Sequence, residues 1–472
     1  MSHHHHTDYE KVVSEKGPQQ LSSSMKGIFV AMIVVGLLAF VGALFLLPER
    51  RIAWISFLHN LYYFTGLSAG GMCVAAIMHV ARSHWGRPVK RFAESMAAFL
   101  PVTLVGIIVL WIGAMFVEPA YVETTDAAGA VHKEWIWDTD EYAKIKGTLA
   151  DPNETIWEWV GIRPDSEHFH NKHFWLQTNF VFGRQALLVL LLIFVSWKFR
   201  SNSDRTDFAL ASTHNSDWPA PSDYGDHETE VEKSQNNQTF WGVAYCFAYP
   251  VVYSLMAYDF IMSLDYRWVS SMFGGWNFTS GLLQSWGMLV FIAWWMGGRH
   301  GISQYFPTKL YHDLGKLTFG FTIVWGYLFF AQLNVIWYGN LGHETGWLIT
   351  RFHPEGHWGM LGITVACMVF LLPFLIGLGK KRKYSPATFA PVVIISAVGL
   401  WLERFLLITP AAWYYDRANE TFSDGVGLLL LVDFFVLIGF IGIFCLLFAR
   451  YLYKRPVMVV SDPKLDMGIN RH

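Results

Sequence analysis

Two charged side chains lie deep inside apolar stretches of the sequence, where they could take up and release protons. Arg184 stands in "FVFGRQALLVLL" and Asp433 in "LLLLVDFFVLIG". If the first stretch begins near residue 173, Arg184 lies eleven residues inside it, about 16 Å along a helix and near the midplane of a membrane. Pairing Arg184 with Asp433 would be the cheapest way to keep both there, although nothing in the sequence brings their helices together. A structural ion pair and a proton-handling role both remain open.

A histidine and a tyrosine begin a stripe of small residues in the second apolar stretch. The stripe, at helical spacing, consists of His59, Tyr63, Gly66, Gly70, Cys73 and Ile77. The two glycines have the Gly-x-x-x-Gly arrangement that favours close helix packing. His59 could bind a quinone oxygen or pass a proton, and a histidine that only packs in the interior is the alternative. His59 and Tyr63 are therefore candidates for quinone binding.

Adjacent opposite charges occur in "WLERFLLITP". Glu403 and Arg404 point about 100° apart on a helix, so we expect that they do not simply neutralise each other. Each then needs its own partner or contact with water, which favours a functional role.

Further titratable residues lie near the ends of apolar stretches. Asp259, in "YDFIMSLDYRWVSSMFGGW", lies just inside a span, where an acid should face a polar route or a partner. His312 and Asp313, in "YHDLGKLTF", lie at the start of another span, and a solvated helix start is the simpler interpretation there.

The composition indicates which elements must position these groups. The chain has 472 residues, of which 53% are hydrophobic, 17% aromatic and only 15% charged, values typical of an integral membrane protein. Ten stretches are long enough to cross a bilayer: approximately 27–47, 52–81, 95–118, 173–197, 239–262, 280–298, 316–338, 357–378, 386–409 and 424–449. Each must be helical, because a helix satisfies its own backbone in lipid. The fold class is thus an all-α integral membrane protein with about ten transmembrane helices.

Basic residues predict the orientation. Lys and Arg cluster after the second, sixth, eighth and tenth spans, which places that side and both termini in the cytoplasm; Arg50 and Arg51 are the exception. We divide the chain into a cytoplasmic N-terminal segment (1–26, whose four histidines are set aside as a tag or native sequence), a ten-helix membrane domain (27–455) and a cytoplasmic tail (456–472).

Two connections inside the membrane domain are long. Residues 119–172 form an acidic, tryptophan-rich periplasmic loop suited to a partner surface or the headgroup region. Residues 199–238 are polar and serine-rich, and we expect a flexible cytoplasmic linker.

Several kinds of chemistry are disfavoured. The four cysteines are far apart and within spans, so the chain has no Cys-x-x-Cys motif for a cluster or covalent haem. Haem b would need only two facing histidines, and the candidates are His59, His79, His173, His312 and His357. A net charge of −2 and the absence of a phosphate-binding glycine loop argue against a nucleic-acid partner and an ATP-driven pump.

Three motifs carry a resemblance to a known family. With "SLDYRWVSSMFGGW", "LGKLTFGFTIVWGYLFFAQLNVIWYGNLGHETGW" and "WLERFLLITP", the chain from residue 27 onward resembles the F subunits of alternative complex III. These belong to the NrfD/polysulfide-reductase superfamily of membrane subunits in bacterial quinol:cytochrome c (or oxidase) oxidoreductases. The resemblance implies two four-helix bundles plus two flanking helices in the bacterial inner membrane. It also implies that this chain has no redox cofactor of its own.

The resemblance further implies the partners and the role. Partner subunits would carry haem c and iron–sulfur clusters as a multihaem cytochrome c and an iron–sulfur protein, beside a homologous C subunit and a terminal oxidase. Quinone or quinol is the candidate ligand, with the main quinol site in the C subunit. This chain would then be a proton-translocation path or a secondary quinone-binding subunit. It would act as part of an oxidoreductase complex rather than as a catalyst alone.

We accordingly expect a proton path in three parts. An outer half-channel would be marked by Asp259, His59, Glu403 and Arg404. The middle of the path would be marked by Arg184 and Asp433, and its inner mouth by His312 and Asp313. Two alternatives remain: a structural anchor for extracytoplasmic redox subunits, and a secondary transporter, for which broken helices and inverted repeats should appear.

Overall fold

The chain is an all-α, multi-pass membrane protein. The computed structural model describes residues 13–15, 17–47, 50–115, 121–125, 131–135, 174–265, 268–354, 358–412 and 425–470. Within them, nine helical segments are long and apolar enough to cross a membrane. A further long helix, α9 (Met272–His300), lies at the predicted sixth span. Most of the loop 119–172, residues 1–12, Tyr266, Arg267, His173 and His357 lie outside the described residues.

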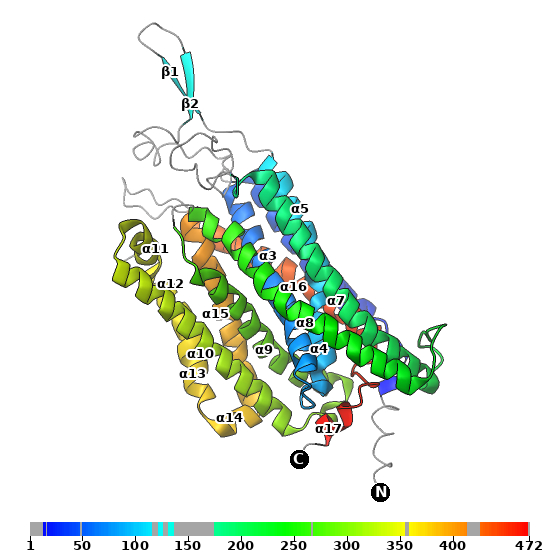
Figure 1. The fold of residues 1–472 in the computed structure, drawn as a ribbon. Coiled ribbons are helices and arrows are strands. Elements are labelled where there is room, and N and C mark those ends of the chain that lie inside the picture. The colour runs from blue at the N-terminus through cyan, green and yellow to red at the C-terminus, as the bar shows by residue number, and fades with distance from the viewer. Residues whose placement is uncertain are drawn as a thin grey trace.

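The helices form two four-helix groups with a pair beside them (Figure 1). The first group consists of α3 (Arg51–Val80), α4 with α5 (Lys90–Met96 and Leu100–Met115), α7 (Thr178–His214) and α8 (His227–Phe260). The second consists of α9, α10 (Thr308–Gly339), α12 with α13 (Gly359–Ala366 and Leu372–Gly377) and α15 (Pro386–Ala412). The flanking pair is α2 (Ser23–Leu46) and α16 (Gly425–Tyr453). This is the arrangement expected, and α3 joins the groups because it contacts α8, α9, α15 and α16.

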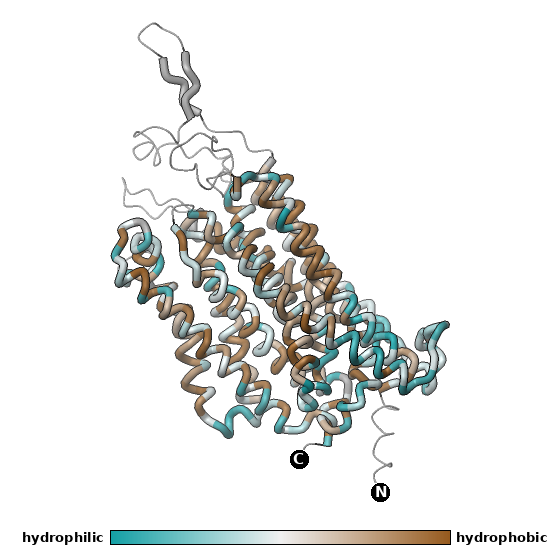
Figure 2. Tube along the Cα trace, in the orientation of Figure 1, coloured by the Kyte–Doolittle hydropathy of each residue, from teal (hydrophilic) through white to brown (hydrophobic). Residues whose placement is uncertain are grey.

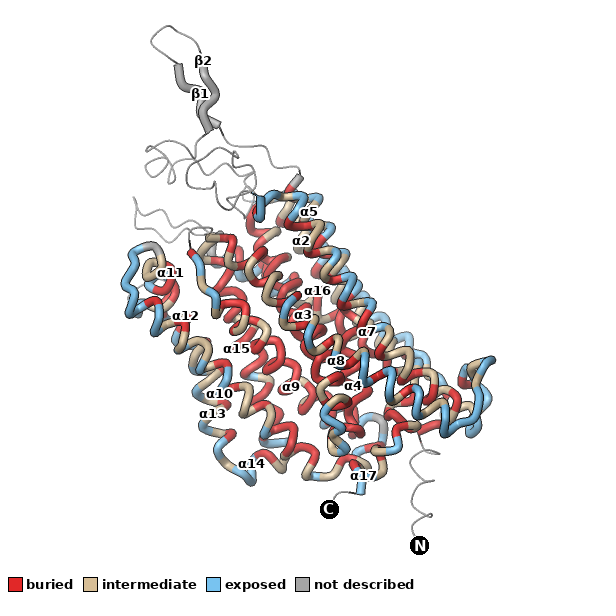
Figure 3. Tube along the Cα trace, in the orientation of Figure 1, coloured by how far each residue is buried: buried red, intermediate tan, exposed pale blue. Residues whose placement is uncertain are grey.

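The segment before α2 and the end of α16 lie on the same side of the helical domain, since the Gln19 amide donates to the Tyr453 carbonyl at 2.8 Å. We call the side that holds Ser23 and Tyr453 the terminal side. Hydrophobic residues predominate in the middle of the outer helices, whereas hydrophilic residues gather where α7 and α8 extend on the terminal side (Figure 2). The residues that face other helices are buried, and α3 is enclosed by protein along almost its whole length (Figure 3).

The segment 199–238 is not a flexible linker, so that expectation is wrong. Helix α7 continues to His214 and α8 begins at His227, and the two pack side by side beyond the membrane. Asp226 caps α8 by accepting a hydrogen bond from the Thr229 amide at 3.1 Å, and this bond lowers the pKa of Asp226. The polar composition of this segment correctly predicted contact with solvent, but it did not mean that the segment lacks regular structure.

A buried arginine holds this helical hairpin against α4. The Arg91 guanidinium contacts Glu94 at 2.6 Å, Asp204 at 2.7 Å and Asp207, and all four residues are buried. Asp207 also accepts hydrogen bonds from Ser461 in the C-terminal segment. We call Arg91, Glu94, Asp204 and Asp207 the terminal-side ion cluster.

The remaining elements are short. They are η1 (Arg87–Val89), η2 (Ala97–Phe99), β1 (Tyr121–Thr125), β2 (Val131–Trp135), η4 (Met262–Asp265), η5 (Ser303–Tyr305), α11 (Gly342–Phe352), η6 (Cys367–Leu371), α14 (Lys380–Tyr384) and α17 (Leu465–Ile469). β1 pairs with β2 in an antiparallel hairpin. The π-helical turn η6 interrupts the predicted eighth span just before Pro373, whose missing N–H cannot bond the Val369 carbonyl.

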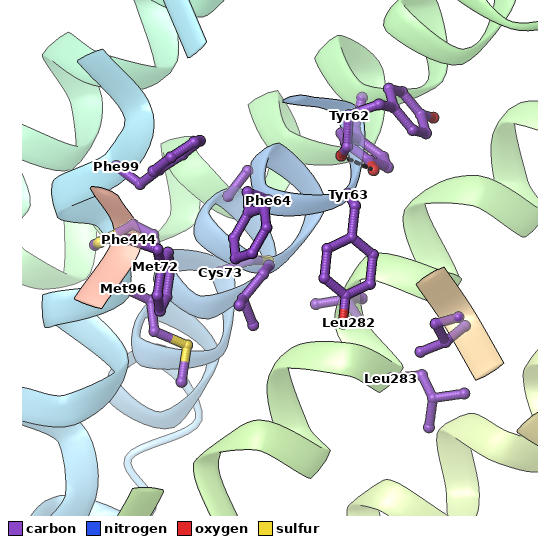
Figure 4. Close-up of a cluster of buried hydrophobic side chains, with 14 of the residues drawn as sticks. Tyr62, Tyr63, Phe64, Met72, Cys73, Met96, Phe99, Leu282, Leu283 and Phe444 are labelled. Atoms are coloured by element: carbon purple, nitrogen blue, oxygen red, sulfur yellow. Dashed lines mark hydrogen bonds between the residues drawn. The ribbon is translucent and has the colours of Figure 1, made fainter. Parts of the chain in front are cut away.

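The glycine stripe of α3 packs closely, as its spacing predicts. A Cβ on Gly70 would lie 2.6 Å from the Gly281 carbonyl oxygen of α9, and one on Gly66 would lie 2.5 Å from the Tyr253 hydroxyl. On another side of α3, Phe64, Phe99 and Phe444 gather in an aromatic core, while Tyr62 and Tyr63 point elsewhere (Figure 4).

Replacing Gly70 with Ala is expected to destabilise the protein by about 1–3 kcal/mol, because the Gly281 backbone cannot easily move away. Gly320→Ala on α10 is the matched control, since nothing lies within 4 Å of its Cβ position and alanine favours a helix. Thermal unfolding in detergent measures both. Equal unfolding temperatures for the two variants would contradict the close contact of α3 with α9.

Candidate functional site

Three helices bring a histidine and a carboxylate together inside the membrane domain. The His59 Nδ1 atom of α3 lies 2.8 Å from Asp433 Oδ2 of α16, and His59 Nε2 lies 2.8 Å from the Trp401 carbonyl oxygen of α15. His59 and Asp433 are fully buried. Both lie eight residues from the start of their helices, about 12 Å along each axis, which places the pair in the half of the membrane away from the terminal side.

The hydrogen bonds of His59 determine how many protons the pair holds. A carbonyl oxygen can only accept, so His59 Nε2 carries a hydrogen. One further proton then lies between Nδ1 and Asp433 Oδ2: the carboxyl donates it to a neutral imidazole, or an imidazolium donates it to the carboxylate. Either form has no net charge, which suits a buried site. The pair is thus a place where one proton can move by a short transfer.

Asn60 fixes the other oxygen of Asp433. Its Nδ2 atom donates to Asp433 Oδ1 at 2.7 Å and to the Ser56 carbonyl at 2.9 Å, and its Oδ1 accepts from the Trp401 indole at 3.0 Å. His59, Asn60, Trp401 and Asp433 therefore form one closed network, which we call the central network.

Glu403 and Arg404 form an ion pair with each other, so the expectation that they do not simply neutralise each other is wrong. Arg404 Nη1 lies 2.5 Å from Glu403 Oε2. The long arginine side chain bends round the helix and overcomes the difference in direction at Cβ. Glu403 also has other partners: its Oε1 accepts from the Trp325 indole at 2.8 Å and from Ser280 at 3.3 Å.

Buried tyrosines surround the guanidinium of Arg404. It lies 5.4 Å from the centre of the Tyr62 ring, which stacks on Tyr253 at 5.0 Å, and Tyr249 continues the stack at 5.8 Å. The Tyr62 hydroxyl donates to Asn277 at 3.1 Å. Arg404 Nε has no hydrogen-bond partner among the described residues. The aromatic faces thus stabilise a cation that one carboxylate only partly satisfies.

Arg184 pairs with Asp259 rather than with Asp433, so the Arg184–Asp433 pair is a wrong prediction. Arg184 Nη2 lies 2.8 Å from Asp259 Oδ2, and the guanidinium stacks on Trp175 at 3.8 Å. Gln185 and the Trp175 indole also donate to Asp259. Because α7 begins only at Thr178, Arg184 lies about 9 Å into the helix, near the membrane surface opposite the terminal side. Both oxygens of Asp259 are bonded, and the pair therefore has the geometry of a structural lock.

His312 and Asp313 lie at the terminal side, near the start of α10, whereas the central network lies in the other half of the membrane. The helix begins at Thr308, so neither residue caps it. Lys316 Nζ lies 2.8 Å from Asp313, and the His312 ring stacks on Tyr384 at 4.2 Å. On α14, outside the spans, burial and then the charge of Lys316 lower the pKa of Lys383.

One face of α10 connects that end to Glu403. Thr318 and Thr322 are buried on it, and each hydroxyl donates to a carbonyl one turn earlier in the helix. Trp325, one turn further on, bonds Glu403. Ser396 Oγ and Gln284 Nε2 are also buried and have no partner among the described residues; such atoms are where internal water binds in proteins.

An apolar pocket of about 680 Å³ adjoins the central network. Tyr63, Trp401 and Phe434 line it, and Arg299 and Tyr453 line it nearer the terminal side. The Tyr63 hydroxyl donates to the Ala397 carbonyl at 3.0 Å. The volume of the pocket is in the range of small-ligand sites. Tyr63 is thus in the pocket wall, whereas His59 lies behind Trp401.

Sequence reasoning missed the neutral partners and the buried cation Arg351. Asn60 is adjacent to His59 in the sequence, and the four-residue spacing of Tyr245, Tyr249 and Tyr253 could have indicated a common face. Arg351 of α11 gave no signal: it donates to the carbonyls of Leu406 and Leu407 at 3.2 Å each. Leu406 is free to accept because Pro410 has no N–H.

The fold and these clusters define the class of protein: a multi-pass, all-α membrane protein that encloses ionisable groups between two helical groups. Within the described residues, no group of three or more His, Cys, Asp or Glu side chains could hold a metal ion. A scan against protein-family models and a search of curated proteins found no match.

Proposed function

We propose that this chain is a membrane subunit of a respiratory quinol:cytochrome c (or oxidase) oxidoreductase of the alternative complex III type, and that it conducts protons. The observation that carries the proton role is the 2.8 Å contact between His59 Nδ1 and Asp433 Oδ2, two buried atoms that need one shared proton to bond. The three sequence motifs support the assignment to this complex.

The proposed route differs from the one that the sequence suggested. Protons enter at His312 and Asp313 on the terminal side and follow Thr318 and Thr322 to Glu403. From Glu403 they pass to the central network, which lies within one turn of it on α15. Arg184 and Asp259 are left out, because their hydrogen bonds stabilise the fold. Basic residues on the terminal side support a cytoplasmic location for it in a bacterial inner membrane.

The pocket beside the central network favours a second role, binding of a quinone. It is almost entirely apolar, as an isoprenoid tail requires, and Trp401 belongs to both the pocket and the network. In this role the chain itself holds no redox cofactor, and haem c and iron–sulfur clusters belong to partner subunits. The partners proposed are a multihaem cytochrome c, an iron–sulfur protein, a homologous C subunit and a terminal oxidase.

The quinone role predicts the effect of filling the pocket. Val398→Trp, at a partly exposed pocket residue, is expected to reduce labelling by an azido-quinone at least about fivefold, since the indole occupies space that the tail needs. Ile395→Trp, on the same helix and equally near the surface but not in the pocket wall, is the control and should label like the wild type. Equal labelling of both variants would exclude this pocket as the quinone site.

Purification from the native membrane tests the assignment to a complex. A haem-containing assembly with quinol oxidation activity is expected to accompany this chain. A colourless protein that purifies alone would instead favour a secondary transporter. An active assembly in which no substitution in the route changes proton release would favour a structural anchor.

A further inference from the structure

A second pocket lies at the edge of the membrane domain on the terminal side. It has a volume of about 350 Å³ and lies between α5, α7 and α16. Four of its lining residues are cations: Arg200, Arg450, Lys454 and Arg455. Asp204 is the single acid in the wall. The pocket is separate from the central network and from the larger apolar pocket, so it does not depend on the proposed function.

The acid in the wall pairs with only one of these cations, Arg455. Asp204 Oδ1 accepts from Arg91 at 2.7 Å, and its Oδ2 accepts from Arg455 at 2.7 Å, so both oxygens are already engaged. Arg450 and Lys454 are exposed and have no acidic partner among the described residues. They are four residues apart at the end of α16, where like charges repel. The pocket therefore has an excess of positive charge that an anion would relieve.

A buried hydroxyl group in the wall also lacks a partner. Tyr451 lines the pocket, and its hydroxyl oxygen is buried without a hydrogen bond to any described residue. The Arg455 guanidinium lies 3.8 Å from the centre of the Tyr451 ring, and that of Arg200 lies 5.0 Å from it. These contacts hold two arginines against the ring that carries the hydroxyl group. Together they offer several hydrogen-bond donors in one place, as phosphate oxygens require.

The side of the pocket toward the membrane centre is apolar. Trp197 and Leu447 line it, and Trp197 is half exposed, at the level where tryptophan is favoured in membrane interfaces. Farther from the terminal side, α5 and α7 expose large apolar side chains such as Ile108 and Leu190. A ligand with its charge among the cations would thus have lipid-facing surface along the rest of its length.

We propose that this pocket binds the phosphate headgroup of an anionic phospholipid, with the acyl chains lying along α5 and α7. The unpaired cations supply the charge, the Tyr451 hydroxyl a hydrogen bond to a phosphate oxygen, and Trp197 the contact at the interface. A soluble phosphate compound would use the cations but not the apolar helices. Basic pockets between helices at a membrane surface are suited to this class of lipid.

Native mass spectrometry of the purified full-length protein, or of its assembly, titrated with phosphatidylglycerol or phosphatidylcholine tests the proposal. We expect tight binding of phosphatidylglycerol alone, and about thirtyfold weaker binding by the variant Arg450→Gln/Lys454→Gln, which lacks two interfacial cations. Lys380→Gln/Lys381→Gln on α14 removes the same charge from exposed residues elsewhere and should change the affinity less than about twofold. Tyr451→Phe keeps the ring between the arginines and should weaken binding by about threefold to tenfold.

Other outcomes would overturn the proposal. They are equal binding of the two lipids, equal loss in both double variants, or displacement of phosphatidylglycerol by millimolar inorganic phosphate, which would indicate a free-phosphate site. If the Arg450→Gln/Lys454→Gln protein fails to fold, the Tyr451→Phe variant decides, because it removes only a hydroxyl group that has no partner in the protein. An unchanged affinity in that variant, with wild-type thermal stability, would then exclude the headgroup position.

Discussion

Replacing Asp433 with Asn is expected to abolish proton translocation while leaving the helical domain folded. The amide has nearly the same size and can still contact His59 and Asn60, so the central network keeps its shape. It cannot hold the proton that lies between Asp433 and His59, however. Since a positioned acid–base group accelerates proton transfer by about 10²–10⁴-fold, the ratio of protons to electrons, counted beyond the one proton per electron that quinol oxidation itself releases, should fall at least about tenfold. Proteoliposomes of the assembled complex, with a pH-sensitive dye, measure this ratio.

Two substitutions serve as controls for Asp433→Asn. Asp433→Glu keeps a carboxyl group and should retain part of the activity. Asp259→Asn removes a buried carboxylate from the Arg184 lock, so it should lower stability without changing the ratio of protons to electrons. If Asp433→Asn retains full proton release in an assembled complex, the proton path through the central network is wrong.

Replacing Arg91 with Gln is expected to destabilise the protein by about 3–5 kcal/mol, the largest effect on folding among the substitutions considered. The arginine lies among Glu94, Asp204 and Asp207, and without it these acids face one another in a buried site. The loss should be greatest where α7 and α8 extend beyond the membrane, because the terminal-side ion cluster attaches that hairpin to α4. Thermal unfolding measures the loss of stability, and hydrogen exchange of residues 199–238 shows whether the loss is greatest in the hairpin.

Arg205→Gln is the matched control for Arg91→Gln. Arg205 also lies in α7 and forms two ion pairs, with Asp223 and Glu230, but it is partly exposed to solvent. Its loss should cost less than about 1 kcal/mol. Similar unfolding temperatures for the two variants would show that the buried terminal-side ion cluster stabilises the protein no more than the exposed ion pairs of Arg205 do.

The helices could be predicted from the sequence, but the pairs between them could not. A span of about 20 apolar residues in lipid must be helical, so length and composition were enough to place the helices. The depth of Asp433 could be estimated in the same way. Its partner could not, because that depends on which helix faces Asp433 on α16, and Asp433 faces His59 and Asn60 of α3 rather than α7. Arg184 was assigned to the wrong acid for this reason.

Other errors came from applying local rules to side chains that reach far. Directions at Cβ separate Glu403 from Arg404, yet the guanidinium group lies several bonds away and closes the gap. In residues 199–238, polar composition concealed a helical hairpin whose buried contacts are partly ionic. In both places the stabilising interactions involve charged groups at the ends of side chains, which hydrophobic patterns do not report.

The enclosure of α3 by both helical groups has a consequence for biosynthesis. This segment leaves the ribosome long before α9 and α15, which cover it in the finished protein. Until they arrive, His59 and Asn60 must remain beside the translocon or face lipid, where uncovered polar groups are unfavourable. Insertion of the second half is therefore what withdraws α3 from lipid, so nascent chains that end before α9 should be held by the insertion machinery or degraded.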